Sequence, residues 1–87
     1  MTDRDAPQPP PFPGFREIAQ RRRRVIGELT RARRDQGLSQ TEVAARMGTS
    51  QSVVARIESA ESDVRLSTVE RYAAAVGRRL DWQLRDG

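Results

Sequence analysis

The chain has 87 residues and a formal net charge of +4, and it contains no cysteine and no histidine. It therefore has no disulfide, no thiol nucleophile, no imidazole base and almost none of the usual zinc ligand sets. No Gly-rich phosphate loop and no pattern of paired carboxylates accompanies the acidic residues. We interpret the chain as a binding protein and not an enzyme, with no metal and no cofactor.

All sixteen basic residues are arginines, whose side chain suits bidentate contacts with phosphate and with guanine. Eight of them fall within residues 16–34 against two acids, whereas the residues after Arg34 hold seven arginines against eight acids. We expect the positive charge on the N-terminal side. No apolar run approaches the ~18 residues of a membrane span, and the N-terminus lacks the apolar segment of a secretory signal. A cytoplasmic protein with no membrane contact is expected.

Residues 1–14 combine five prolines with few apolar side chains, which predicts a disordered, Pro-rich arm in front of the folded domain. One interpretation of the arm is a recognition peptide for a partner, with Phe12 and Phe15 as anchors. The other is a solvated tail.

Helical spacing begins at Phe15 or Arg16 and continues to about Gln36, where Gly37 is suited to end a helix. The apolar positions of this first helix are Ile18, Val25, Ile26, Leu29 and Ala32. The arginines at 21–24 cannot all face one way, because successive helical residues turn by about 100°. They form either a solvated face or a surface in which one or two reach a DNA phosphate or an acidic patch of a partner.

Two short helices joined by a tight turn are predicted over residues 38–58. Ser39 and Glu42 form a capping box, so a helix starts at about Gln40 and runs to a turn at Gly48. Ser50 is the N-cap of the next helix. The buried faces of the two helices are predicted to hold Val43, Ala44, Met47, Val53, Val54 and Ile57. This is the pattern of a helix-turn-helix, whose second helix lies in the DNA major groove.

A polar loop is expected over residues 59–65, followed by a fourth helix that Gly77 ends. Ser67 and Glu70 form a second possible capping box, although Leu66 looks buried and the helix can begin one or two residues earlier. The apolar stripe of this helix consists of Leu66, Val69, Tyr72, Ala73 and Val76.

The last segment, residues 78–87, changes to a period of two, since Leu80, Trp82 and Leu84 alternate with polar residues. This alternation predicts a half-buried strand, and no second strand in the chain is available to pair with it. The same strand of a second copy would satisfy its backbone in a two-stranded ribbon, which makes these three residues the predicted dimerisation contacts. The alternative is an irregular turn or short helix that places Trp82 on its own core.

From Leu29 to Val76 the sequence resembles the XRE family of phage-repressor and Cro-like helix-turn-helix regulators. The resemblance rests on GLSQ at residues 37–40, on Ala44 and Gly48, on the Ile57–Glu58 pair and on the final AxxG at residues 74–77. It implies an all-α, four- to five-helix lambda-repressor-like DNA-binding domain over residues 15–77, with a short C-terminal β-strand over residues 78–87 that pairs across a homodimer. The implied function is sequence-specific binding of double-stranded DNA by a homodimeric repressor with a palindromic operator.

The resemblance also implies roles for single residues. Base contacts fall on Gln51, Ser52 and Arg56, of which Gln51 suits adenine and Arg56 suits guanine; the alternative is an ordinary exposed helix face. Phosphate contacts fall on Gln40, Thr49 and Ser50. Arg33 and Glu58 match a structural ion pair.

The ending RYAAAVGRRLDWQL, residues 71–84, looks like the subgroup that includes the HigA-type antitoxins. For this chain that likeness implies an alternative function, in which an antitoxin neutralises a protein toxin and represses its own operon. The N-terminal arm or the first helix would be the surface for the toxin.

Overall fold

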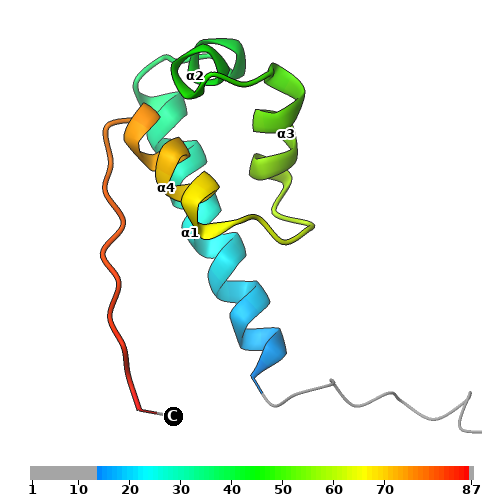
Figure 1. Cartoon of the computed structure of the whole chain (residues 1–87), viewed down its shortest axis with the longest axis vertical. Coiled ribbons are helices and arrows are strands. Elements are labelled where there is room, and N and C mark those ends of the chain that lie inside the picture. Colours follow the sequence, from blue (N-terminus) through cyan, green and yellow to red (C-terminus); the bar gives the residue numbers. More distant parts are fainter. Residues whose placement is uncertain (1–13, 87) are drawn as a thin grey trace, which may run out of the picture.

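Four helices follow one another in the part of the chain that the structure, a computed structural model, describes: residues 14–86. They are α1 (Phe15–Asp35), α2 (Gln40–Met47), α3 (Gln51–Ser59) and α4 (Leu66–Ala75). Figure 1 shows α4 beside the second half of α1, with α2 and α3 at the end where α1 finishes. The first half of α1 extends away from α2 and α3. The predicted all-helical class and the first three helix starts are confirmed.

The core lies where the four helices meet. Tyr72 of α4 is its largest fully buried side chain, and it is only 1% exposed. Apolar residues of all four helices surround it, as the helical spacing of the sequence predicts. The core cluster consists of Leu29, Ala32, Val43, Ala44, Met47, Val54, Ile57, Val69, Tyr72, Ala73 and Val76.

Two expectations at the edges of this core are wrong. The helix α4 begins at Leu66, the earlier start that the sequence also allows, with Arg65 as its N-cap; no side chain caps it, so the possible capping box of Ser67 and Glu70 is absent. Leu66 is 52% exposed, and Ile18 of α1 is 55% exposed. Both keep the predicted spacing, but no neighbouring element in the described chain reaches far enough to cover them.

The C-terminal segment, residues 78–86, is neither helix nor strand. It passes beside α4 and returns toward the N-terminal end of α1 (Figure 1). The N–H of Arg78 donates to the carbonyl of Ala73, and residues 79–86 make no backbone–backbone hydrogen bond within the described chain. A strand is defined by a hydrogen-bonded neighbour, which a single copy does not offer here. The predicted strand is therefore absent from the single chain, and of the alternative the irregular course is observed while the short helix is not.

The predicted arm lies outside the described residues except for Gly14, which precedes α1. None of the helices described here combines the length and the apolar character that a bilayer crossing needs.

Candidate nucleic-acid interface

The turn between α2 and α3 is built by local hydrogen bonds. Ser39 Oγ accepts the N–H of Glu42, and the Glu42 carboxylate accepts the N–H of Ser39, so the predicted capping box is present. These backbone and side-chain hydrogen bonds lower the pKa of Glu42. Gly48 has a φ of 71°, a left-handed conformation that costs an L side chain energy. Helix α3 starts only three residues later, and the side chain of its first residue, Gln51, reaches Gln40 at the start of α2.

Helix α3 begins behind Ser50, whose Oγ accepts the N–H of Val53. Only one side of this helix is covered, since Val54 and Ile57 are buried in the core. Gln51, Ser52 and Arg56 are all exposed. The three predicted base-contacting side chains therefore lie on the uncovered part of the helix, as the helical spacing requires.

The amide of Gln51 does not hang free in the solvent. Its Nε2 donates to Oε1 of Gln40 over 2.6 Å, and Nε2 of Gln40 donates to Oε1 of Glu58 over 3.0 Å. Gln40 is the first residue of α2, so this chain of bonds links the first residues of α2 and α3 to the end of α3. An anchored amide has fewer rotamers to lose when it binds a ligand.

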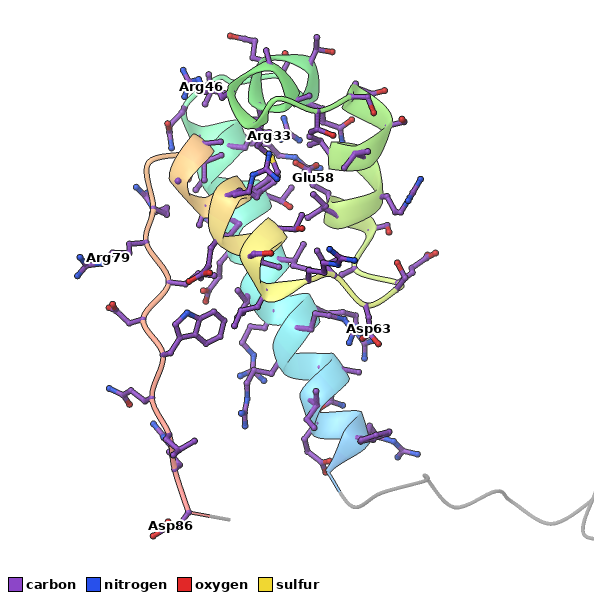
Figure 2. All side chains as sticks on the ribbon, in the orientation of Figure 1. Arg33, Arg46, Glu58, Asp63, Arg79 and Asp86 are labelled. Carbon is purple, nitrogen blue, oxygen red and sulfur yellow. The ribbon has the colours of Figure 1, made fainter. Side chains whose placement is uncertain are left out.

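Glu58 anchors this chain of bonds in the protein interior. Its carboxylate accepts Nε of Arg33 at 2.6 Å and Nη2 at 3.0 Å, and it also accepts the hydroxyl of Tyr72. The side chains of Arg33 and Glu58 are only 10% and 7% exposed. Figure 2 shows the two side chains pointing toward each other between α1 and α3. Nη1 of Arg33 donates to the carbonyl of Leu38, so the pair also ties down the segment between α1 and α2.

The pKa values of this cluster reflect its burial and its bonds. Burial raises the pKa of Glu58, but hydrogen bonds from Arg33, Tyr72 and Gln40 outweigh it and leave the pKa below its ordinary value. Burial and the bond to Glu58 raise the pKa of Tyr72 to about 12. The hydrogen bond to Glu58 raises the pKa of Arg33 against the effect of burial. At neutral pH the cluster therefore contains an ionised pair and a neutral phenol.

The remaining predicted contact residues surround the first turn of α3. Ser50 and Ser52 are exposed, and their hydroxyl oxygens lie 3.0 Å apart. Thr49 is half-buried, and its N–H donates to the carbonyl of Ala44 at the end of α2. The guanidinium of Arg56 makes no ion pair within residues 14–86. The structure thus places five hydroxyl, amide and guanidinium side chains around one surface, namely Gln40, Ser50, Gln51, Ser52 and Arg56.

The arginines at 21–24 lie elsewhere. They belong to the first half of α1, which extends away from α2 and α3 (Figure 1). Nη1 of Arg22 pairs with Asp63 of the α3–α4 loop at 2.8 Å. Arg21–Arg24 therefore lie at the end of the molecule opposite the helix-turn-helix, whereas Arg31, Arg33 and Arg34 belong to the end of α1 next to α2.

Sequence reasoning missed three side chains that hold the interface together. Tyr72 reads only as a core residue of α4, yet its hydroxyl contacts Glu58. Arg46 of α2 donates to the carbonyl of Ala75, and Arg71 of α4 donates to that of Met47, so each arginine bonds to the C-terminal end of the other helix. Arg46 lies in the last turn of its own helix, a position from which basic side chains often bond to helix carbonyls, but Arg71 does not. The sequence does not say which helix end is near.

The predicted dimerisation residues differ in their surroundings. Leu80 is half-buried against the core cluster. Trp82 is 57% exposed, and its indole N–H donates to Glu70 at 3.2 Å. Leu84 is fully exposed. Among residues 14–86, no three or more acidic side chains gather where they could hold a metal ion.

A helix-turn-helix family model matches residues 29–83, which is more than half of the chain and includes α2, the turn and α3. The chain belongs to the XRE-type helix-turn-helix family. Two relatives are proteins named antitoxin HigA1 from Mycobacterium tuberculosis, one from strain CDC 1551 / Oshkosh and one from strain H37Rv. Each is 45% identical to the chain over 71 residues, covering 82% of this chain and 48% of the relative. The chain thus spans about half the length of these relatives. No solved structure matches the helix-turn-helix chain significantly.

Proposed function

We propose that the chain is a sequence-specific DNA-binding transcriptional regulator that places α3 in the major groove and acts as a homodimeric repressor. The observation that carries this proposal is the exposed polar surface around the start of α3, where Gln40 holds the amide of Gln51. A helix-turn-helix contacts base edges with the first residues of its second helix, and these are the residues that the surface presents.

Base contacts are assigned to Gln51, Ser52 and Arg56. The Gln51 amide uses one N–H on Gln40 and keeps its second N–H and its carbonyl oxygen, the two groups that a bidentate pair with adenine needs. Arg56 lies further along the same helix with a guanidinium suited to guanine. Each such pair typically contributes ~1–3 kcal/mol of discrimination against the wrong base. Phosphate contacts are assigned to Gln40, Thr49 and Ser50, which border the beginnings of α2 and α3.

A homodimer would give the interface its second half. Residues 79–86 present backbone groups without backbone partners in the described chain, and Leu84 contacts nothing that would shield it from water. Pairing of this segment with its copy would satisfy the backbone and cover Leu84. In such a twofold dimer the two α3 helices would stand about one DNA turn, ~34–36 Å, apart and would read a palindromic operator.

The antitoxin function is the second candidate, and the resemblance to two proteins named antitoxin HigA1 favours it. The surface for a toxin would be the N-terminal arm or the first half of α1, which lies away from the DNA-binding surface. One chain could then repress its operon and neutralise a toxin. The test is whether the product of a neighbouring gene is toxic alone, is neutralised by this chain on co-expression, and co-purifies with it.

The test of DNA binding starts with selection of bound sequences from a random DNA pool, which supplies an operator. Affinities of the Arg56→Ala variant are then measured for that operator and for random DNA. We expect a larger loss on the operator, because a base contact is absent from random sequences. Arg16→Ala is the matched control, since it removes the same charge at the far end of α1 and should preserve the difference between the two DNAs. Equal losses for Arg56→Ala on both DNAs would limit that residue to phosphate.

The dimer is tested by sedimentation of a chain that lacks residues 80–87 and of the variant Leu84→Arg. Both should be monomeric and should bind the operator poorly. Leu84→Arg changes a side chain that is fully exposed in the single chain, so its fold is expected to be unaffected. Dimers of both variants would contradict pairing through this segment.

A further inference from the structure

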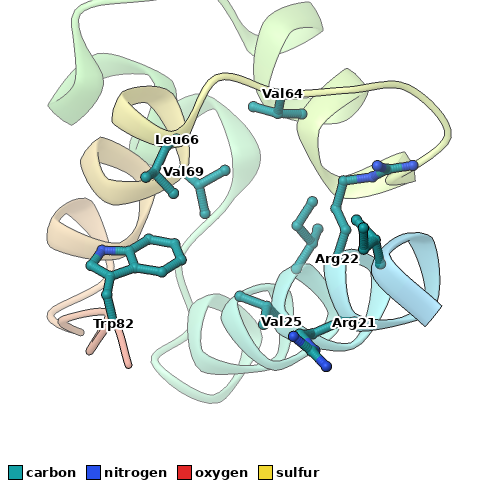
Figure 3. Close-up of a pocket in the computed structure, with 9 residues that line it drawn as sticks. Arg21, Arg22, Val25, Val64, Leu66, Val69 and Trp82 are labelled. Atoms are coloured by element: carbon teal, nitrogen blue, oxygen red, sulfur yellow. The ribbon is translucent and has the colours of Figure 1, made fainter. Parts of the chain in front are cut away.

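An apolar groove lies at the end of the molecule away from α2 and α3. Its volume is about 300 Å³. The first half of α1 forms one wall, α4 and the residues before it form another, and Trp82 of the C-terminal segment closes the side (Figure 3). The residues that line it are Ile18, Arg21, Arg22, Val25, Ile26, Val64, Leu66, Val69 and Trp82.

The groove is uncovered in the described chain. Three of its apolar residues, Ile18, Leu66 and Trp82, are each more than half exposed. They come from three separate elements and face one space, so they are unlike isolated apolar residues on an ordinary surface. Covering them would remove a continuous apolar area from water, which is the main driving force for docking.

The segment in front of α1 has the chemistry that such a groove accepts. Residues 1–13, MTDRDAPQPPPFP, contain all five prolines of the chain, and Phe12 is the second-last residue of this segment. Proline-rich segments favour the extended polyproline conformation, lose little entropy on binding and dock into grooves lined by aromatic side chains. Trp82 is the aromatic residue of this groove, and Phe12 is a side chain large enough to fill part of it.

The point of attachment and the length of the segment also fit. The N–H of Ile18, at the near end of the groove, donates to the carbonyl of Gly14. Gly14 has a φ of 89°, a conformation that lets the chain turn sharply just before α1. From Ile18 to Ile26 the wall of α1 is ~12 Å long. Thirteen residues in the polyproline conformation span ~40 Å, so the segment can return along the whole groove.

The charges favour this segment over a second copy as the occupant. Arg21 and Arg22 line the groove, and Arg23 and Arg24 follow them on α1. Two copies packed face to face here would bring these arginines together, which is repulsive. Residues 1–13 carry Asp3 and Asp5 against one arginine. A tethered segment also binds at an effective concentration of order millimolar, without any cost of association between chains.

We propose that residues 1–13 fold back onto their own chain and dock in the groove, with Phe12 and the prolines between α1 and Trp82. This intramolecular contact goes beyond the proposed DNA binding and does not depend on it. It covers the apolar end of the domain and occupies the surface of α1 next to the arginines. A protein that binds this surface must therefore displace the segment.

The full chain offers a direct test, because Trp82 is its only tryptophan and it has no cysteine. A nitroxide attached to the single cysteine of Gln8→Cys quenches tryptophan fluorescence on contact. We expect strong quenching of Trp82 in this chain. The matched control carries the same label and the additional change Phe12→Ala, which keeps the tether length and removes the anchor. Its quenching should be much weaker.

A mixture of labelled chains with a large excess of unlabelled Trp82→Phe chains distinguishes one molecule from two. Quenching within a molecule is unchanged by the excess chains, and this is the expected result. A loss of quenching would mean that the segment of a second copy occupies the groove, which overturns the proposal. Equal quenching with and without Phe12 would overturn it too. Neither measurement contains DNA, so the outcome is separate from the test of Arg56.

Discussion

Replacement of Glu58 by glutamine tests whether the buried cluster supports the interface. The carboxylate accepts two bonds from Arg33, one from Gln40 and one from Tyr72. Glutamine has nearly the same shape as glutamate but no charge. Its NH2 group would face the guanidinium of Arg33, which also has only N–H donors, so one hydrogen bond of the pair would be lost. Arg33, whose side chain is 10% exposed, would keep its positive charge without a counterion.

The expected loss is large for a domain of this size. Breaking a buried ion pair by removing one partner costs ~3–5 kcal/mol. Native domains are stable by only ~5–15 kcal/mol, and small ones lie at the lower end. At ~4–8 °C per kcal/mol the melting temperature of Glu58→Gln should fall by roughly 12–40 °C. A surface ion pair contributes only ~0–1 kcal/mol, so the loss expected for a buried pair is easily distinguished from that of an exposed pair.

The assay is equilibrium unfolding in urea, with the free energy of unfolding of Glu58→Gln compared with the unchanged chain. The matched control is Asp35→Asn, which breaks the exposed Arg31–Asp35 pair, whose charged atoms are 4.0 Å apart. It should change the free energy of unfolding by less than about 1 kcal/mol. The double variant Arg33→Met/Glu58→Leu should recover part of the loss, because neither charge remains buried. A deficit of ~1–3 kcal/mol should persist from the hydroxyl of Tyr72, which loses its acceptor.

The pH dependence gives an independent check. The folded pKa of Glu58 lies below its unfolded value of ~4.3, so its contribution to stability is present above that pH and is lost as the pH falls through the folded pKa. The difference in the free energy of unfolding between Glu58→Gln and the unchanged chain should therefore become smaller at acid pH. Two results would refute the assignment of Glu58 as the anchor: a loss of unfolding free energy in Glu58→Gln no larger than that in Asp35→Asn, or a loss that stays constant down to acid pH.

Three further predictions concern stability. Gly27→Ala, in the interior of α1 with open space around it, should stabilise the chain by ~0.5–1 kcal/mol, whereas Gly48→Ala, at a φ of 71°, should destabilise it by ~1–2 kcal/mol; urea unfolding of both checks the opposite signs. Ser39→Ala should cost ~0.5–2 kcal/mol by removing the cap of α2, and an unchanged midpoint in urea would contradict this. The folded pKa of Tyr72 is raised to about 12, above its unfolded value of ~10. Its contribution to stability is therefore complete below pH ~10 and is lost as the pH rises through about 12. Tyrosinate absorbance reports it directly, since the chain has one tyrosine; ionisation near 10 in the folded chain would be the wrong result.

The bounds of α2, the start of α3 and the position of the turn between them could be predicted from the sequence because their causes are local. The capping box of Ser39 and Glu42, the left-handed Gly48 and the N-cap Ser50 each act within a few residues of the backbone that they satisfy. The helix-turn-helix depends mainly on such contacts, and its apolar positions follow from the helical period. The family was therefore recognisable from the sequence alone.

Contacts between helices could not be predicted in the same way. The cluster at Glu58 joins α1, α2, α3 and α4, and the residues that meet in it are 14–25 positions apart in the chain. Hydrophobic spacing shows that Tyr72 faces inward, but it does not show which polar group its hydroxyl meets. The family resemblance predicted the Arg33–Glu58 pair, but the sequence pattern did not predict that Gln40 and Tyr72 also bond to Glu58.

The sequence by itself determined where the first three helices begin and which side chains α3 presents, because caps and helical periodicity act over a few residues. Only the tertiary structure decided what those side chains rest on and where the charge lies. It linked Gln51 through Gln40 to Glu58, placed Arg21–Arg24 of α1 at the opposite end, and left Leu66 and Trp82 around an open groove. These outcomes depend on which distant surfaces meet, and distances through space are set by packing rather than by position along the chain.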